Sequence, residues 1–167
     1  MTALPETIKR PVSSAAVLAA IMAGLDLTSK WLIVSFFGFE TGRAVAVLPF
    51  LDVTLVWNSG ISYGLFSDQG EAGRYLLIGA TIMIIGFIGW TVRSVETRLG
   101  VVGYGLILGG ALGNLVDRLV HGAVVDFISL HAAGYYWYVF NLADIWICLG
   151  VALLLFDFWK NPPQESQ

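Results

Sequence analysis

The chain has 167 residues, of which 57% are hydrophobic and only 13% charged, and its formal net charge is −3. Soluble domains carry roughly 25% charged residues, so this composition favours a membrane protein. The acidic balance and the scattered Lys and Arg residues give no reason to expect a nucleic acid partner. The single cysteine, Cys148, excludes an internal disulfide and the metal sites that are built from several cysteines.

Residues 12–37 form the first of four long apolar runs. The run is too long for a secretory signal peptide and contains Asp26 and Lys30, so we expect a retained transmembrane helix. The two charged residues are four positions apart and share one helix face, which predicts an ion pair near the membrane. Intramembrane charges are costly, so a structural pair and a direct chemical role are both open interpretations.

Residues 38–73 differ from the apolar runs and are expected to lie outside the hydrocarbon. The stretch Val45–Phe66 is rich in β-branched and aromatic residues, and Pro49 and several glycines supply turn signals. We therefore predict short strands that form a small sheet on the membrane surface. Asn58, before a Ser-Gly pair, is either a turn residue or a side-chain amide that holds an extended peptide.

The second and third spans are expected at residues 74–92 and 99–118, joined by a short polar link. In the third span, Gly105, Gly109 and Gly113 recur every four positions. They form a stripe of small residues along one helix face. Such stripes allow another helix to approach closely in a membrane, so we predict a tight helix contact there.

The third span ends in polar residues. Asn114 and Arg118 are four positions apart and face the same side of the helix. Asp117 points elsewhere, and we expect a structural or capping role for it. Ionisable groups beside membrane-length segments are expensive, so this cluster indicates a function.

Residues 119–138 form the second outer segment, and residues 139–159 form the fourth span. His121 and His131 lie near aspartates in the outer segment, which raises the question of a zinc site. The HExxH spacing is absent, however, and zinc sites need three or four convergent ligands, so we predict no metal. The aromatic-rich residues 134–140 are typical of a membrane-interface belt.

Two aspartates outside the apolar runs are the candidate reactive groups. Asp126 lies in the second outer segment; Asp144, with Asn141 three positions before it, lies in the first turns of the fourth span. Two carboxylates held close together cannot both ionise cheaply, so one pKa rises and the pair shares a proton. In such a pair the ionised carboxylate can activate water, and the protonated one can donate to a carbonyl oxygen.

Four spans place both termini on one side of the membrane. Arg93, Arg98, Lys160 and the basic residues of the N-terminal tail lie on that side, and this excess of positive charge marks it as cytoplasmic. The candidate polar residues then converge at the extracytoplasmic face. We therefore expect an all-α membrane protein of one domain, residues 1–167, with four transmembrane helices and a small extracytoplasmic β-rich segment.

Five short stretches follow one another from the first span to the fourth: Asp26–Lys30, Asn58–Gly60, Gly109–Arg118, Val124–Phe127 and Phe140–Asp144. Together they closely resemble the corresponding motifs of the lipoprotein signal peptidases of bacteria, the signal peptidase II family. The resemblance implies an aspartic peptidase of the inner membrane with four spans. It also implies the reaction, which is removal of the signal peptide from a prolipoprotein just before a cysteine that already carries diacylglycerol.

The resemblance assigns roles by motif. It implies that Asp126 and Asp144 are the catalytic pair. It implies supporting or substrate-binding roles for six further residues: Asn58, Asn114, Arg118, Asn141, Asp26 and Lys30. It implies no cofactor and no metal, and its expected partners are the lipidated prolipoprotein, membrane lipid and globomycin-type peptide inhibitors.

Two other classes of function compete with the peptidase. A proton-coupled carrier also uses membrane carboxylates, but it predicts internal repeats and carboxylates near the middle of the bilayer. The sequence has no such repeat, and its paired aspartates lie at one edge. A structural assembly factor without chemistry gives no reason for Asp126, Asp144, Asn114 and Arg118 to converge.

Overall fold

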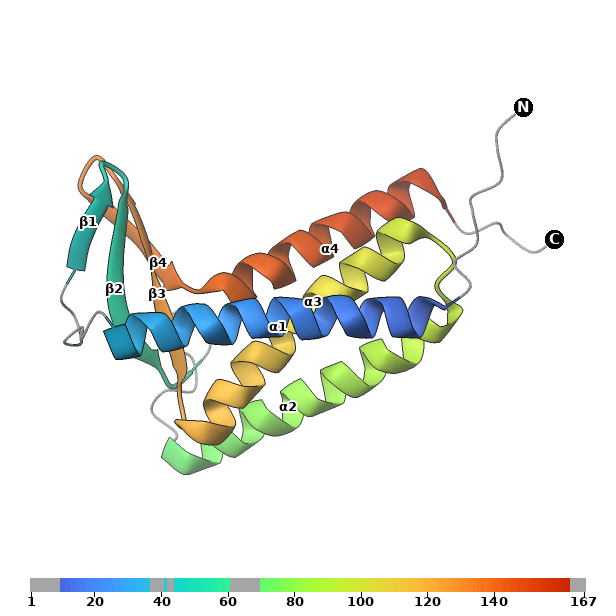
Figure 1. The fold of residues 1–167 in the computed structure, drawn as a ribbon, viewed down its shortest axis with the longest axis horizontal. Coiled ribbons are helices and arrows are strands. Elements are labelled where there is room, and N and C mark those ends of the chain that lie inside the picture. Colours follow the sequence, from blue (N-terminus) through green and yellow to red (C-terminus); the bar gives the residue numbers. More distant parts are fainter. Residues whose placement is uncertain (1–9, 37–40, 42–43, 61–69, 163–167) are drawn as a thin grey trace.

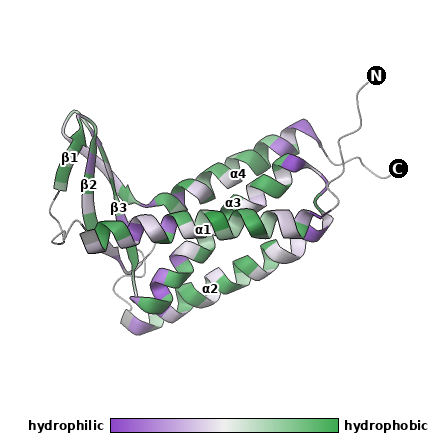
Figure 2. Ribbon diagram, viewed as in Figure 1, coloured by the Kyte–Doolittle hydropathy of each residue, from purple (hydrophilic) through white to green (hydrophobic). Residues whose placement is uncertain are grey.

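The computed structural model describes residues 10–36, 41, 44–60 and 70–162. Within these ranges lie four long helices, α1 (Pro11–Phe36), α2 (Gly70–Thr91), α3 (Arg98–Val120) and α4 (Leu142–Lys160), and each is long and apolar enough to cross a membrane. They form one bundle, with a sheet across one end of it (Figure 1). The middle turns of the helices are predominantly hydrophobic, and hydrophilic residues gather toward the two ends (Figure 2). The predicted membrane architecture is therefore confirmed.

Helix α3 packs against α1 through the predicted glycine stripe. A Cβ atom added at Gly109 would lie 2.6 Å from Met22 Cβ, and one at Gly105 would lie 2.9 Å from Leu18 Cδ2. One added at Gly113 would collide with the Asp26 carboxylate. The stripe thus brings α1 close enough to α3 for Asp26 to reach the end of α3 that carries the polar residues.

A second glycine contact joins α3 to α4 and was not predicted. A Cβ at Gly150 would lie 2.6 Å from Gly103 O, and one at Gly103 would lie 3.0 Å from Gly150 O. At Gly110 the added atom would collide with Ala143 O. Helix α3 is therefore the central helix, held closely by α1 on one side and by α4 on another.

The sheet has four antiparallel strands in the order β1 (Ala44–Leu48), β2 (Leu51–Asn58), β3 (Val124–Ala132) and β4 (Tyr135–Phe140). Its central pair joins two distant parts of the chain, with Val56 opposite Asp126 and Asn58 opposite Val124. A small apolar cluster of Ile33, Leu55, Val125 and Phe127 packs the sheet onto the helix ends. This packing places the middle of β3 beside the first turn of α4.

The structure corrects the predicted outer segments. Strands were expected only in the first one, but residues 119–138 contribute β3 and most of β4, and the stretch 134–140 is largely a strand that pairs with β3. Because Phe140 pairs with Ile128, α4 begins at Leu142 and not at residue 139. Helix α2 begins four residues before residue 74, and the predicted strand residues 61–66 lie outside the described part of the chain.

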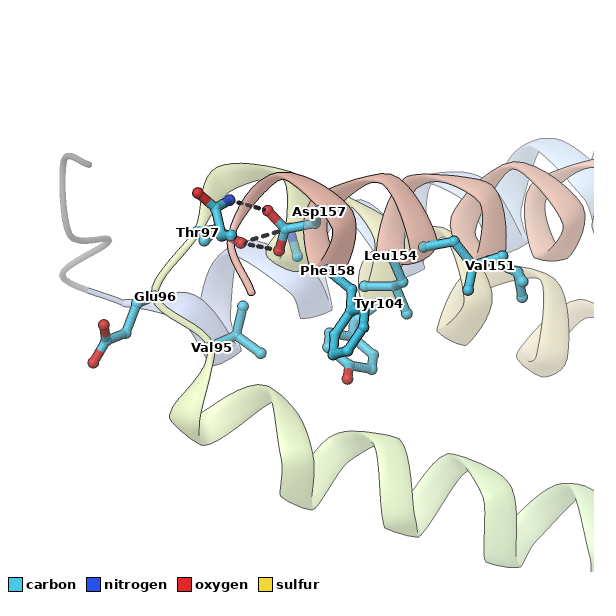
Figure 3. Close-up of a pocket in the computed structure, with 11 residues that line it drawn as sticks. Val95, Glu96, Thr97, Tyr104, Val151, Leu154, Asp157 and Phe158 are labelled. Carbon is cyan, nitrogen blue, oxygen red and sulfur yellow. Dashed lines mark hydrogen bonds between the residues drawn. The ribbon is translucent and has the colours of Figure 1, made fainter. Parts of the chain in front are cut away.

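The polar link between the second and third spans is short and ordered. A single 3₁₀ turn, η3 (Val92–Ser94), follows α2, and the Thr97 hydroxyl caps α3 by accepting from Gly100 N at 3.0 Å. Beside this link a pocket of about 540 Å³ opens between the ends of α3 and α4, with Asp157 and Leu154 among its lining residues (Figure 3). It lies at the end of the bundle away from the sheet.

Candidate active site

All eight predicted site residues lie where the sheet meets the helix ends. Strand β2 ends in Asn58, β3 carries Asp126, and α4 carries Asp144 directly after its cap Asn141. Helix α3 supplies Asn114 and Arg118 from its last two turns, and α1 supplies Asp26 and Lys30. These eight residues come from five different elements, and hydrogen bonds connect them into one network.

Asp126 is buried, with 2% of its surface exposed. Each of its oxygens accepts a hydrogen bond from an amide: Oδ1 from Asn141 Nδ2 at 2.6 Å and Oδ2 from Asn58 Nδ2 at 2.9 Å. The pKa of Asp126 is raised to about 6 as the net result of opposing effects: burial, the largest effect, and the nearby Asp144 raise it, whereas the two amides lower it. The environment thus keeps this carboxyl partly protonated near neutral pH.

Asp144 has a more open position and also accepts two hydrogen bonds. Asn114 Nδ2 donates to Oδ1 at 3.1 Å, and the backbone N–H of Asn141 donates to Oδ2 at 3.2 Å. The second bond belongs to a capping box, because the Asn141 side chain accepts in return from Asp144 N at 3.1 Å. Asn141 therefore precedes α4 as its cap and does not lie within its first turns as predicted.

Asn141 connects the two carboxylates. Its amide nitrogen contacts Asp126, while its backbone N–H and carbonyl oxygen Oδ1 contact Asp144. Since the side chain is completely buried, it has one setting that satisfies all three bonds. This single residue fixes how Asp126 on β3 lies relative to Asp144 on α4.

Lys30 orients the second bridging amide. Lys30 Nζ donates to Asn114 Oδ1 at 2.9 Å, and Asn141 Nδ2 lies 3.3 Å from the same oxygen. Because two donors converge on Oδ1, the Asn114 amide nitrogen must face Asp144. The lysine therefore acts on the Asp144 carboxylate through Asn114.

Lys30 also holds two buried carboxylates. The predicted pair is present, with Lys30 Nζ 2.7 Å from Asp26 Oδ2, and a second carboxylate, Asp117 Oδ2, lies 2.9 Å away. Asp26 accepts from Ala143 N at 2.9 Å, and Asp117 accepts from Val125 N at 3.1 Å. The two aspartates thus anchor the backbone beside Asp144 and beside Asp126, respectively, which agrees with a structural role for Asp117.

Arg118 is half-buried on the other side of the network. Its Nη2 donates to Gly60 O at 3.1 Å, and Gly60 N donates to Asn58 Oδ1 at 3.0 Å. Its Nε is buried and has no partner among the described residues. Arg118 lies within electrostatic reach of Asp144 and Asp126 and keeps donor capacity available beside them.

An apolar pocket of about 730 Å³ opens beside Asp144. Its other lining residues come from β4, from the end of β3 and from the outer face of α4: Leu130, Trp137, Tyr138, Phe140, Ile145, Ile147, Cys148 and Leu149. A carboxylate at the edge of an apolar pocket can meet a substrate that combines a polar reacting bond with an apolar group.

The two histidines lie apart. His121 Nδ1 is 3.8 Å from Asp117 Oδ1 at the end of α3, whereas His131 Nε2 is 3.2 Å from Asp52 Oδ1 on the sheet. Within the part of the chain that the structure describes, no three His, Cys, Asp or Glu side chains form a metal-binding group. The structure therefore gives the alternative zinc interpretation no ligand set among these residues.

Several contacts of the site were not predicted from the sequence. Tyr138 Oη accepts from Asn58 Nδ2 at 2.8 Å, and Gly60 connects Asn58 to Arg118. The aromatic run that contains Tyr138 indicated an interface belt, and only the pairing of β4 with β3 turns this tyrosine toward Asn58. The anchoring of Val125 by Asp117 likewise depends on a contact between α3 and β3.

Comparisons with known proteins found similar sequences and similar folds. The family model described as signal peptidase (SPase) II matches residues 18–160. A lipoprotein signal peptidase of Rhodopseudomonas palustris is 50% identical over 150 residues, covering 84% of this chain and 89% of that protein. One from Methylobacterium sp. is 42% identical over 148 residues, covering 89% and 90%. A solved structure described as a bacterial membrane enzyme matches with a TM-score of 0.82 at 25% identity, covering 99% of this chain and 98% of that one.

Proposed function

Since the chain belongs to the signal peptidase II family, and is therefore a membrane protease that removes signal peptides from prolipoproteins, we propose that Asp126 and Asp144 perform the cleavage. The single observation that supports this most strongly is the Asn141 bridge, which contacts both carboxylates at distances of 2.6 to 3.2 Å. The two acids come from different elements, and the buried Asn141 side chain holds them together. That arrangement suits an acid/base pair.

The two carboxylates have different surroundings, which assigns their roles. Asp126 is buried with a raised pKa of about 6, which suits the acid that carries the shared proton, and we assign the role of the base to the more open Asp144. Asp144 takes a proton from water as the water oxygen bonds to the scissile carbonyl carbon. Asp126 donates its proton to the carbonyl oxygen.

The resulting tetrahedral intermediate then collapses. The carbon–nitrogen bond breaks, and the leaving amine takes the proton that Asp144 had removed from water. The hydroxyl formed on the former carbonyl oxygen returns its proton to Asp126. Both carboxyls thus end in their starting states, and the net reaction is hydrolysis of one peptide bond by one water molecule.

The supporting residues prepare this chemistry before substrate arrives. Asn141 and Asn114 fix the carboxylate geometry, and Lys30 and Asp26 hold Asn114 and the start of α4 in place. Donors fixed in advance need no reorganisation when charge develops at the reacting atoms. Arg118, with Nε available, donates to a substrate carbonyl or to the ester of the lipid group. Asn58 supports Asp126 from the sheet side.

The substrate is a prolipoprotein whose cysteine carries diacylglycerol. The apolar pocket beside Asp144 is continuous with the outer face of α4, so an apolar chain can enter it from the bilayer. Membrane lipid is then a neighbour of the site, and globomycin-type peptide inhibitors would occupy the same space. The four helices and the sheet act as a single domain, since the network includes residues from both.

The site faces the extracytoplasmic side, with both termini in the cytoplasm. Arg10, Arg93, Arg98 and Lys160 lie at the end of the bundle opposite to the sheet, and positive charge favours the cytoplasmic side. The carboxylate pair lies beneath the sheet at the other end. This location at an edge of the bundle favours surface hydrolysis over a proton-coupled carrier with acids at mid-membrane.

The test is incubation of the purified protein with a diacylglyceryl-modified prolipoprotein, followed by separation of the released signal peptide. The matched control is the same prolipoprotein with its cysteine replaced by serine, which cannot carry the lipid. We expect release from the lipidated protein alone. Proton transport into proteoliposomes without any peptide release would support the carrier instead.

A further inference from the structure

Arg74, near the start of α2, contacts the end of α3 that carries Arg118. Its Nε donates to Arg118 O at 3.0 Å, and its Nη2 donates to Leu119 O at 2.9 Å. The last carbonyl groups of a helix have no partner within the helix and must be satisfied from outside. Arg74 therefore caps α3 from a neighbouring helix with two bonds from one planar guanidinium group.

The residue that follows the end of α3 leaves space for the Arg74 side chain. Gly122 follows α3 with a φ of +80°, a conformation that glycine adopts without strain. A Cβ atom at Gly122 would lie 3.2 Å from Arg74 Nη1, closer than ordinary contact. The positive charge at a helix C-terminus is also favourable for the helix dipole. The two backbone hydrogen bonds, the charge favoured by the helix dipole and the space left by Gly122 are thus all consistent with an arginine at residue 74.

The capped residue is part of the candidate active site. While its backbone carbonyl accepts from Arg74, the Arg118 side chain donates to Gly60 O, and Gly60 N donates to Asn58. Asn58 in turn donates to Asp126 Oδ2. A displacement of the last turn of α3 would therefore shift the Arg118 guanidinium and, through Gly60, the amide that supports Asp126.

We propose that Arg74 is a positioning residue of the peptidase, which sets the Arg118 side chain beside the carboxylate pair without touching substrate. The proposal rests on the function proposed above for Arg118 and Asp126. It makes helix α2 a part of the active-site support, in addition to the two helices that pack closely on α3. A displacement of about 1 Å can cost about 100-fold in rate, so a remote cap can control turnover.

The experiment measures kcat and KM for release of signal peptide from a diacylglyceryl-modified prolipoprotein. Arg74→Ala should lower kcat/KM about 10- to 100-fold. Arg74→Lys, which keeps the charge but loses the two-pronged donor, should show an intermediate loss. Arg93→Ala, in the turn η3 that follows the other end of α2, is the matched control, with a change of about 2-fold or less. Thermal stability is measured for each variant. If Arg74→Ala fails to insert into the membrane, the kinetic comparison with the wild type is made with Arg74→Lys.

A double-mutant cycle separates positioning from a general structural role. If Arg74 acts through Arg118, then Arg74→Ala should cost little further activity in an Arg118→Lys background, although it still lowers stability there. Additive losses of activity, or full activity in Arg74→Ala, would overturn the proposal while leaving the peptidase function intact. If the wild-type protein releases no peptide, that result would contradict the proposed peptidase function and also the proposal for Arg74, which depends on it.

Discussion

Removing the Asn58 amide should move the pH dependence of cleavage to higher pH. Asn58 Nδ2 donates to Asp126 Oδ2 at 2.9 Å and so stabilises the ionised carboxylate, whose pKa is about 6. With that pKa, about one tenth of the enzyme carries the Asp126 proton at pH 7, so kcat/KM should fall about tenfold per pH unit above pH 6. This fall is the alkaline limb of the profile.

The size of the shift follows from the bond that is lost. A hydrogen bond to a charged group contributes about 1.5–3 kcal/mol, and one pKa unit corresponds to about 1.4 kcal/mol. Because Asn141 still donates to the other oxygen of Asp126, we take the lower end and expect Asn58→Ala to raise the midpoint by about one unit. At pH 7 the protonated fraction would then rise from about one tenth to about one half.

The assay is kcat/KM for signal-peptide release between pH 5 and pH 9, with each profile normalised to its own maximum. Normalisation matters because Asn58→Ala also loses its contacts with Tyr138 and Gly60, which lowers the rate at every pH. Histidine ordinarily titrates in the same range, so His121→Gln and His131→Gln serve as controls that should leave the midpoint unchanged. A midpoint that stays in place or moves to lower pH in Asn58→Ala would refute the reasoning.

Three further predictions concern packing, the buried charges and orientation. Gly113→Ala brings a methyl group against the Asp26 carboxylate and should destabilise the protein by about 1–3 kcal/mol in a denaturation assay, whereas Gly79→Ala, with open space around it, should not. Lys30→Met leaves two buried carboxylates without their cation and should cost about 3–5 kcal/mol in the same assay; unchanged stability would contradict a stabilising role for the Lys30 ion pairs. In a variant without native cysteine, a thiol introduced at Ala132 should react with an impermeant reagent outside spheroplasts and one at Ser94 should not; the reverse would invert the orientation.

The helices and the glycine face of α3 could be predicted because each signal is local. A long apolar run must be helical in a bilayer, since a helix satisfies its own backbone hydrogen bonds. The repeat Gly105, Gly109 and Gly113 specifies a face, and the spacing of Asp26 and Lys30 specifies a pair, whatever else the chain does. The structure confirms both, and supplies α1 as the partner of the glycine face.

The sheet and the cap at Asn141 could not be predicted in the same way. Pairing of β2 with β3 joins residues about seventy positions apart, and no local pattern specifies that register. The apolar aromatic run before Asn141 suits both a membrane helix and a strand, so the sequence pattern alone does not locate the start of α4 at Leu142. Arg74 has no local signal either, because its role depends on where α2 lies against the end of α3.

The sequence predicted which residues lie together at the candidate site, but not which hydrogen bonds connect them. The motifs that resemble signal peptidase II carry all eight residues, and the structure brings them together at one end of the bundle. The connections are a property of the fold: Lys30 orients Asn114 toward Asp144, and Asn141 contacts both acids. Those contacts explain why several residues outside the carboxylate pair are expected to affect cleavage.

The most direct test of the account is signal-peptide release by Asp126→Asn, Asp144→Asn and the double variant. Each substitution keeps the size of the side chain but removes either the shared proton or the base. We predict that each single variant loses cleavage. The double variant should be hardly worse than either single variant, because the effects of residues that act as a unit are not additive. Substrate binding should survive in all three variants. Asp117→Asn is the comparison, with an expected effect on stability more than on the chemical step. Cleavage at close to the wild-type rate by either single variant would contradict the carboxylate-pair mechanism.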